Sequence, residues 1–145
     1  MIYDLHSHSN ASDGSLEPGD LLALAAECGV GAQAITDHDT LAAYDRIDTE
    51  ASPTRQIPGI EFSTTWGKYG VHFVGLNVDP ACAALRDGVQ RQLEARQLRA
   101  RLIARRLRSK GLPDVLDDVL QIAAGEPVSR PHFAEHLVRA GIVKD

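Results

Sequence analysis

The order of strand and helix patterns in the first 80 residues is the feature that most restricts the fold. Short apolar segments with strand character recur at residues 2–6, 32–36, 56–62 and 71–76. Between the first two, a helix is expected to begin near Pro18, with Ser15 available as its cap, and to end at Gly29. A short helix capped by Asp39 or Thr40 should follow the second strand. This alternation predicts an α/β protein with parallel strands.

The pattern changes after Pro80. Residues 81–110 contain no helix breaker except Gly88, and their apolar positions fall on one helical stripe. A second, shorter helix is expected from Pro113 to about residue 124, and a third after the cap residue Ser129. The sequence therefore predicts two parts, an α/β part at residues 1–80 and a helical subdomain at residues 81–145.

Charge is distributed unevenly along the 145 residues. Residues 1–80 carry three basic and twelve acidic side chains, whereas residues 86–110 carry nine basic and two acidic ones. An acidic part suits a cation site, and a basic segment beside it can attract substrates that carry phosphate.

Two features of the sequence bear on location. No apolar run approaches the roughly 20 residues of a membrane-spanning helix. Only Cys28 and Cys82 are present, in no paired spacing, and the N-terminus does not have the pattern of a secretory signal. We therefore expect a reducing, cytoplasmic location and no membrane partner.

Histidines and acidic residues lie where the predicted strands end. His6 and His8 are two positions apart, so a strand running through both would direct them to the same face. His38 follows the second strand, and Glu61 lies in an otherwise apolar strand, where burying a carboxylate costs several kcal/mol without a partner. His72 lies in the fourth strand. Imidazole with carboxylate suits zinc, manganese or iron rather than calcium.

Several of these residues also have simpler interpretations. Asp13 precedes Gly14, a common turn sequence. Asp37 can orient His38, and Asp39 can cap the next helix. His72 alone could be a half-buried strand residue.

Taken together, the motifs resemble those of the PHP superfamily, named for polymerase and histidinol phosphatase domains. The matching segments are His6-Ser7-His8, Ser12-Asp13-Gly14, Ile35-Thr36-Asp37-His38-Asp39, Gly59-Ile60-Glu61-Phe62-Ser63, His72-Phe73-Val74-Gly75 and Ser129-Arg130-Pro131-His132. The similarity is greatest to the branch of phosphoesterases that act on nucleoside 3′,5′-bisphosphates and short RNA ends. The resemblance implies the N-terminal part of a distorted (β/α)7 barrel with a helical insertion.

The same resemblance implies up to three divalent ions, most often Mn²⁺, with Zn²⁺ or Fe²⁺ as alternatives. By it, His6, His8 and Glu61 would hold a first ion. Glu61 would bridge to a second ion, which His72 would also bind.

For the third ion, the resemblance implies Asp13 and His38 as ligands. Arg130 and His132 would lie in the helical insertion and contact substrate phosphate. The family's barrel continues with another histidine and a late Gly-Ser-Asp-x-His-like motif, which are absent from this sequence. We therefore expect a further chain segment to complete the barrel.

The expected activity is hydrolysis of phosphate monoesters of nucleotides by a hydroxide that the ions generate at neutral pH. Nucleoside 3′,5′-bisphosphates and short RNA ends are the expected substrates. One alternative is a non-catalytic metal-binding module with the same fold. Another is an RNA-binding protein that uses the arginine-rich helix, although that helix has no aromatic residues for base stacking.

Overall fold

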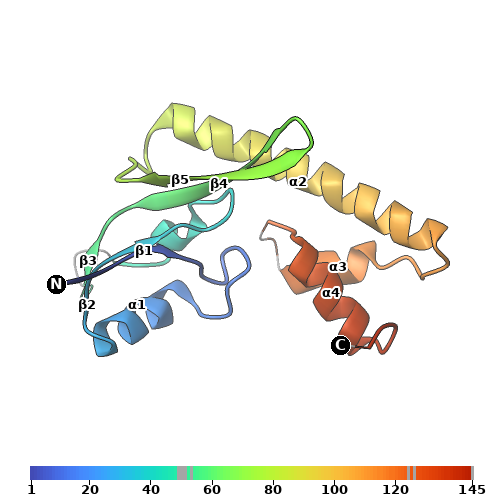
Figure 1. Cartoon of the computed structure of the whole chain (residues 1–145), viewed down its shortest axis with the longest axis horizontal. Helices are drawn as coiled ribbons and strands as arrows, with labels where there is room; N and C mark the ends of the chain where they lie inside the picture. The colour runs from blue at the N-terminus through green and yellow to red at the C-terminus, as the bar shows by residue number, and fades with distance from the viewer. Residues whose placement is uncertain (49–51, 53, 124, 126, 145) are drawn as a thin grey trace. The chain divides into compact units, whose positions relative to one another are not determined.

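The computed structural model describes residues 1–48, 52, 54–123, 125 and 127–144 (Figure 1). The chain divides into two compact units, Met1–Gln92 and Leu93–Asp145. The division falls inside the long helix α2 (Ala83–Ser109), whereas the sequence prediction placed the change at the start of this helix. Each unit is described by itself.

A parallel sheet forms the base of the first unit. Its strands lie in the order β1 (Ile2–Ser7), β2 (Val30–Ile35) and β3 (Arg55–Gln56). Helix α1 (Pro18–Glu27) connects the first two strands and packs on β2 with Leu22 and Ala25 buried. Gly29, with a φ of 77°, ends this helix as predicted. The predicted cap at Ser15 is wrong, because Glu17 occupies the N-cap position and makes no side-chain cap bond.

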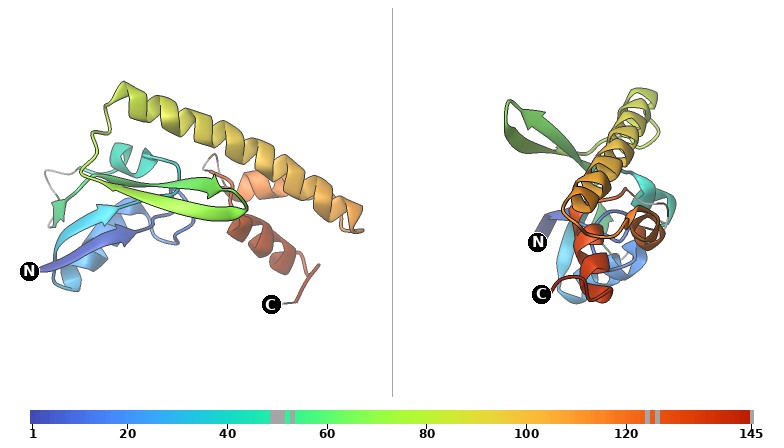
Figure 2. Two further views of the ribbon diagram at one scale, coloured as in Figure 1. Left: turned by 45° about the horizontal axis from the view of Figure 1, so that its top comes forward. Right: turned by 90° about the vertical axis from the view of Figure 1, so that its right-hand side faces the viewer.

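A β-hairpin completes the strands of the first unit. Strands β4 (Gly59–Trp66) and β5 (Tyr69–Leu76) are antiparallel and form a long two-stranded ribbon (Figure 2). The strand predicted at residues 56–62 is divided at Pro58, which has no N–H to donate to a sheet. Parallel pairing is therefore confirmed for β1–β3 and wrong for β4 and β5. The described strands form an open sheet and a hairpin, so barrel closure stays a prediction.

The chain beyond β2 joins the sheet to the hairpin. His38 pairs with Glu61 in an isolated parallel bridge. The Glu61 N–H donates to the Asp37 carbonyl over 3.2 Å, and the Asp39 N–H donates to the Glu61 carbonyl over 3.0 Å. The predicted cap at Asp39 or Thr40 is wrong, because Leu41 occupies the N-cap position of the short helix Ala42–Asp45. The Asp39 carboxylate instead accepts the Ser63 N–H at 2.8 Å. The backbone thus holds two predicted metal ligands, His38 and Glu61, side by side.

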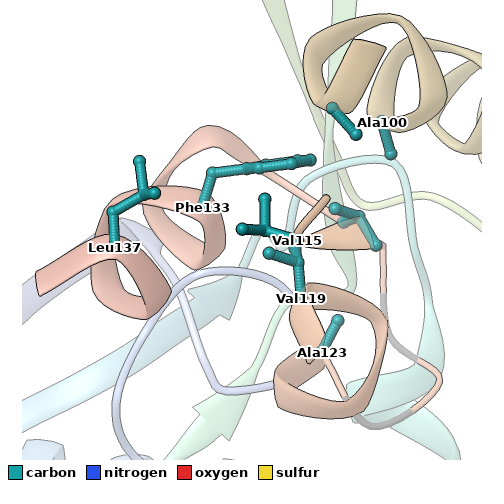
Figure 3. Close-up of a cluster of buried hydrophobic side chains, with 8 residues drawn as sticks. Ala100, Val115, Val119, Ala123, Phe133 and Leu137 are labelled. Atoms are coloured by element: carbon teal, nitrogen blue, oxygen red, sulfur yellow. The ribbon is translucent and has the colours of Figure 1, made fainter. Parts of the chain in front are cut away.

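The second unit is helical, as predicted. The C-terminal half of α2 packs with α3 (Leu116–Ala123) and α4 (Arg130–Arg139) around one apolar cluster (Figure 3). The buried members of this cluster are Ala100, Ala104, Val115, Val119, Ala123, Val128, Phe133 and Leu137. Arg96 is buried beside the helices and donates to the Val128 carbonyl, so one of the α2 arginines serves the fold.

Two further observations concern membrane-spanning helices and the cysteines. Among the described residues, no helix combines the length and apolar character needed to cross a membrane. Cys28 and Cys82 are both exposed, and neither forms a disulfide in the described part of the chain.

Tyr44 links three segments of the first unit. It lies in the short 3-10 helix η1 (Ala42–Asp45), and its hydroxyl donates to the Ile35 carbonyl at 2.5 Å. The same oxygen accepts the Gly59 N–H at 2.8 Å, at the start of β4. Burial raises the pKa of Tyr44 to about 12.

We predict that Tyr44→Phe lowers the free energy of unfolding by about 1–3 kcal/mol, because it leaves two buried backbone groups without a partner. Urea denaturation at neutral pH measures this loss. Unfolded tyrosine ionises near pH 10, whereas Tyr44 in the fold does so at about 12. The unaltered protein should therefore lose stability as the pH rises through this range, and the variant should lose less. Tyr3→Phe, at an exposed position, is the matched control and should change neither quantity.

Candidate metal centre

The carboxylate of Glu61 lies at the centre of the predicted ligand set. The residue is only 4% exposed although it carries a charge. Its Oε2 lies 2.7 Å from His6 Nε2 and 3.0 Å from His8 Nε2. Its Oε1 lies 2.6 Å from His72 Nδ1, across the hairpin. One carboxylate thus contacts histidines from both the sheet and the hairpin.

His6 and His8 both contact Glu61, one from a strand and the other from the loop that follows it. His6 belongs to β1, and His8 follows the last residue of that strand. Their Nε2 atoms lie 3.1 Å apart and both face Glu61 Oε2. The strand therefore does not run through both histidines, and the turn after β1 directs His8 to the same point as His6.

Asp13 and His38 extend the cluster on the side of His8. Asp13 Oδ1 lies 3.5 Å from His8 Nδ1, and Asp13 Oδ2 lies 3.7 Å from His38 Nε2. His38 Nδ1 lies 3.8 Å from Glu61 Oε2. Asp13 is thus both a residue of a tight turn and a member of the cluster, so the two interpretations of the Asp-Gly sequence are compatible.

Three overlapping groups of side chains have the geometry to share an ion. Within each group, the candidate ligand atoms all lie within 4.8 Å of one another. The groups are His6, His8 and Glu61; His8, Asp13 and His38; and His38, Glu61 and His72. All six residues predicted as metal ligands are therefore brought together.

The donor chemistry of the cluster fits divalent metal ions. The Nε2 atoms of His6 and His8 lie 3.1 Å apart and face the same oxygen of Glu61, so three atoms with lone pairs converge on one point. A cation at their meeting point satisfies nitrogen and oxygen lone pairs together. Mixed imidazole and carboxylate ligands suit zinc, manganese or iron.

The protonation state of Glu61 also suits a cation. Burial by itself would raise the pKa of its carboxyl group, but hydrogen bonds to His6 and His72 and the nearby charges of His38 and His6 together lower the pKa. Glu61 is therefore held as a carboxylate, the form that binds metal.

Asp37 lies beside the cluster, but its carboxylate contacts serines. It accepts the Ser9 N–H at 2.8 Å and the Ser9 and Ser12 hydroxyls at 2.6 Å each. Burial raises the pKa of Asp37, and the hydrogen bonds from the two serines only partly oppose this rise. Sequence reasoning assigned no role to Ser9 or Ser12. The polar composition of residues 7–16 predicts a loop but does not indicate which partners these serines bind.

Arg130 and His132 lie in the second unit, at the start of α4. His132 Nδ1 lies 3.0 Å from the Ser129 backbone nitrogen and accepts its N–H, so this ring helps to cap the helix. Arg130 lines a hollow of about 430 Å³ together with Leu102, Ile103 and two further arginines, Arg99 and Arg106. Sequence reasoning identified Arg130 but did not single out Arg99 and Arg106.

The fold and the ligand cluster agree with the comparison to known families. Residues 4–104 match the family model described as PHP domain. The chain therefore belongs to the PHP domain family.

Two curated relatives match nearly the whole chain. The 5′-3′ exoribonuclease Rnm of Salmonella typhimurium is 48% identical over 145 residues, which make up 97% of this chain and 50% of that protein. A 3′,5′-nucleoside bisphosphate phosphatase of Chromobacterium violaceum is 40% identical over 146 residues, or 98% of this chain and 51% of that protein. The chain thus spans about half the length of these curated relatives.

A solved structure supports the same fold. It is an amidohydrolase from Chromobacterium violaceum with bound sulfate and no metal. It matches all of this chain with a TM-score of 0.86 and 37% identity, and the match covers 52% of that protein.

We predict that Glu61→Gln lowers the metal content by more than one ion per protein, because this carboxylate belongs to two of the three ligand groups. Metal analysis after equilibrium dialysis against Mn²⁺ measures the content, and circular dichroism monitors the fold. Glu27→Gln changes an exposed carboxylate at the end of α1 and should leave the metal content unchanged. Loss of a single ion, or of none, would contradict the central position of Glu61 between ions.

Proposed function

We propose that this chain supplies metal-binding residues to a phosphoesterase that hydrolyses phosphate monoesters of nucleotides. Nucleoside 3′,5′-bisphosphates and short RNA ends are the proposed substrates, manganese is the proposed ion, and the proposed location is the cytoplasm. A further chain segment would complete the ligand set and the barrel. The relatives named as an exoribonuclease and a bisphosphate phosphatase support the substrate class.

The observation that carries this proposal is the convergence of four histidines and two carboxylates on one point. Glu61 contributes both oxygens, one toward the β1 histidines and one toward His72. A carboxylate so placed can serve two ions at once. Sites with clustered ions are typical of enzymes that cleave phosphate esters.

The residues of this chain would act by holding and orienting the metal ions. His6, His8 and Glu61 would fix one ion, and Asp13 and His38 would fix another near it. When bound, such ions lower the pKa of water and offset the negative charge that develops on phosphoryl oxygens. The low pKa of Glu61 keeps this carboxylate charged and able to bind cations.

The arginine hollow of the second unit, lined by Arg99, Leu102, Ile103, Arg106 and Arg130, is a candidate contact for substrate phosphate. Its three guanidinium groups form no ion pair with acidic residues in the described part of the chain. A simpler interpretation of Arg130 is a surface ion pair with Glu126 or Glu135. Glu135 pairs with Arg139 at 2.6 Å, and residue 126 lies outside the described residues. A guanidinium is suited to bind two phosphate oxygens together.

His132 is a weaker contributor to the same proposal. Its Nδ1 accepts the Ser129 backbone N–H at 3.0 Å. Its capping role gives the ring a fixed orientation at the start of the helix that also carries Arg130.

The test of the proposal is to compare metal content and phosphatase activity in the intact protein. His6→Ala combined with His8→Ala should remove most bound Mn²⁺ and reduce hydrolysis of a nucleoside 3′,5′-bisphosphate to background. His136→Ala, on α4 beside Asp118, is the matched control and should retain both. Metal binding without turnover in the unaltered protein would instead support a non-catalytic metal-binding module.

We predict that Arg130→Ala lowers kcat/KM for a nucleoside 3′,5′-bisphosphate by about ten- to a hundredfold, since a charge-assisted bond to phosphate contributes about 1.5–3 kcal/mol. The loss should be smaller for a nucleoside monophosphate, which has no second phosphate for Arg130 to hold. Steady-state kinetics with both substrates measures the difference.

The control for this prediction is Arg139→Ala on the same helix. Arg139 is exposed and pairs with Glu135, and surface pairs of this kind contribute roughly 0–1 kcal/mol. Its removal should leave the kinetics unchanged. Equal losses on the two substrates after Arg130→Ala would show that Arg130 does not select for the second phosphate.

A further inference from the structure

The buried carboxylate of Asp37 is the centre of a second polar network beside the metal cluster. Asp37 is 1% exposed, Ser9 is 0% exposed and Ser12 is 3% exposed. The carboxylate accepts three hydrogen bonds from these two serines, at 2.8 Å from the Ser9 N–H and at 2.6 Å from each hydroxyl. We refer to Asp37, Ser9 and Ser12 as the Asp37 network.

The loop between β1 and α1 is folded around this network. The Ser9 carbonyl accepts the N–H groups of Ser12 and Gly14, and Ser9 Oγ accepts the Ala11 N–H. A Cβ atom at Gly14 would lie 2.2 Å from the His8 carbonyl oxygen, so the turn is closed as tightly as a glycine allows. The loop therefore has little freedom to move while Asp37 holds its two serines.

Each member of the Asp37 network adjoins a candidate metal ligand in sequence. Ser9 follows His8, Ser12 precedes Asp13 and Asp37 precedes His38. These three neighbours form one of the ligand groups, with candidate ligand atoms within 4.8 Å of one another. A single buried carboxylate thus ties together the backbone segments that carry all three members of that group.

The Asp37 network accounts for the positions of His8 and Asp13, which secondary structure alone does not. His8 and Asp13 lie on a loop outside β1 and α1, so no ladder of strand or helix hydrogen bonds fixes their distance from His38. The sheet orients His6, and the hairpin orients Glu61 and His72. Only the His8, Asp13 and His38 group depends on a loop for two of its members.

We infer that Asp37, through Ser9 and Ser12, is a positioning residue that sets the geometry of the ion site formed by His8, Asp13 and His38. The inference rests on the proposed metal centre and adds to it. Asp37 does not touch the ion in this role. Its effect is on the affinity of one ion, because residues that orient metal ligands typically change metal affinity by about 10–100-fold when they are removed.

The test is a Mn²⁺ titration of the intact protein by isothermal calorimetry, paired with thermal unfolding in the presence of a chelator. In the double variant Ser9→Ala, Ser12→Ala, the dissociation constant of one ion should rise at least tenfold. The affected ion should be the one that Asp13→Asn also weakens. Ions held by the two groups that contain Glu61 should lose less affinity, because the sheet and the hairpin hold two of the three ligands in each of those groups. Asp37→Asn keeps an oxygen for two of the three hydrogen bonds and should have a smaller effect than Asp37→Ala.

Ser7→Ala is the matched control for a purely structural effect. Ser7 lies between His6 and His8, but its hydroxyl donates to the Ala34 carbonyl at 3.0 Å and accepts from Gln33. This variant should lose thermal stability with unchanged Mn²⁺ affinity.

The possible outcomes distinguish failure of the positioning role of Asp37 from failure of the proposed metal centre. Unchanged Mn²⁺ affinity in the double variant and in Asp37→Ala, with a lower melting temperature, would overturn the positioning role while leaving the metal centre intact. A uniform loss of affinity at every ion would also overturn it. Absence of Mn²⁺ binding by the unaltered protein would overturn both the metal centre and the inference.

Discussion

The carboxylate of Glu61 is buried in an apolar strand, and side chains from several elements of the first unit offset the cost of burying its charge. A charge in this position costs several kcal/mol unless it is paired. Three elements meet there: β1 with His6, the segment after β2 with His38, and β5 with His72. Backbone hydrogen bonds from the Asp39 N–H to the Glu61 carbonyl and from the Glu61 N–H to the Asp37 carbonyl fix the segment after β2 against the hairpin. The position of this one carboxylate thus accounts for how the sheet and the hairpin are joined.

Glu61 in the cluster and Asp37 beside it are both buried carboxylates, and their different partners define different roles. Glu61 faces imidazoles, which present lone pairs to a cation, and its pKa is lowered. Asp37 faces the hydroxyl and N–H groups of serines, which complete its hydrogen bonds without a cation. The first arrangement suits a metal ligand and the second suits a structural tie. This difference explains why only Glu61 belongs to the ligand groups.

The helical unit has its own apolar core and a different charge. Val115, Val119 and Phe133 pack at its centre, so its helices do not need the α/β unit to bury an apolar face (Figure 3). Most arginines of α2 are exposed, and two of them join Arg130 around one hollow. The candidate metal ligands therefore lie in an acidic unit and the arginine hollow in a basic one.

The sequence determined the helices and strands and the six candidate metal ligands, because periodicity, breakers and motif residues are local signals. It predicted α2 and the strand at β1 well, and it identified Glu61 through its apolar surroundings. It did not predict that β4 and β5 pair antiparallel, since pairing partners depend on contacts between distant residues. Nor did it reveal the roles of Ser9 and Ser12. Their hydroxyls gain a role only when folding brings them to Asp37, more than twenty residues later in the chain, where burial makes each hydrogen bond necessary.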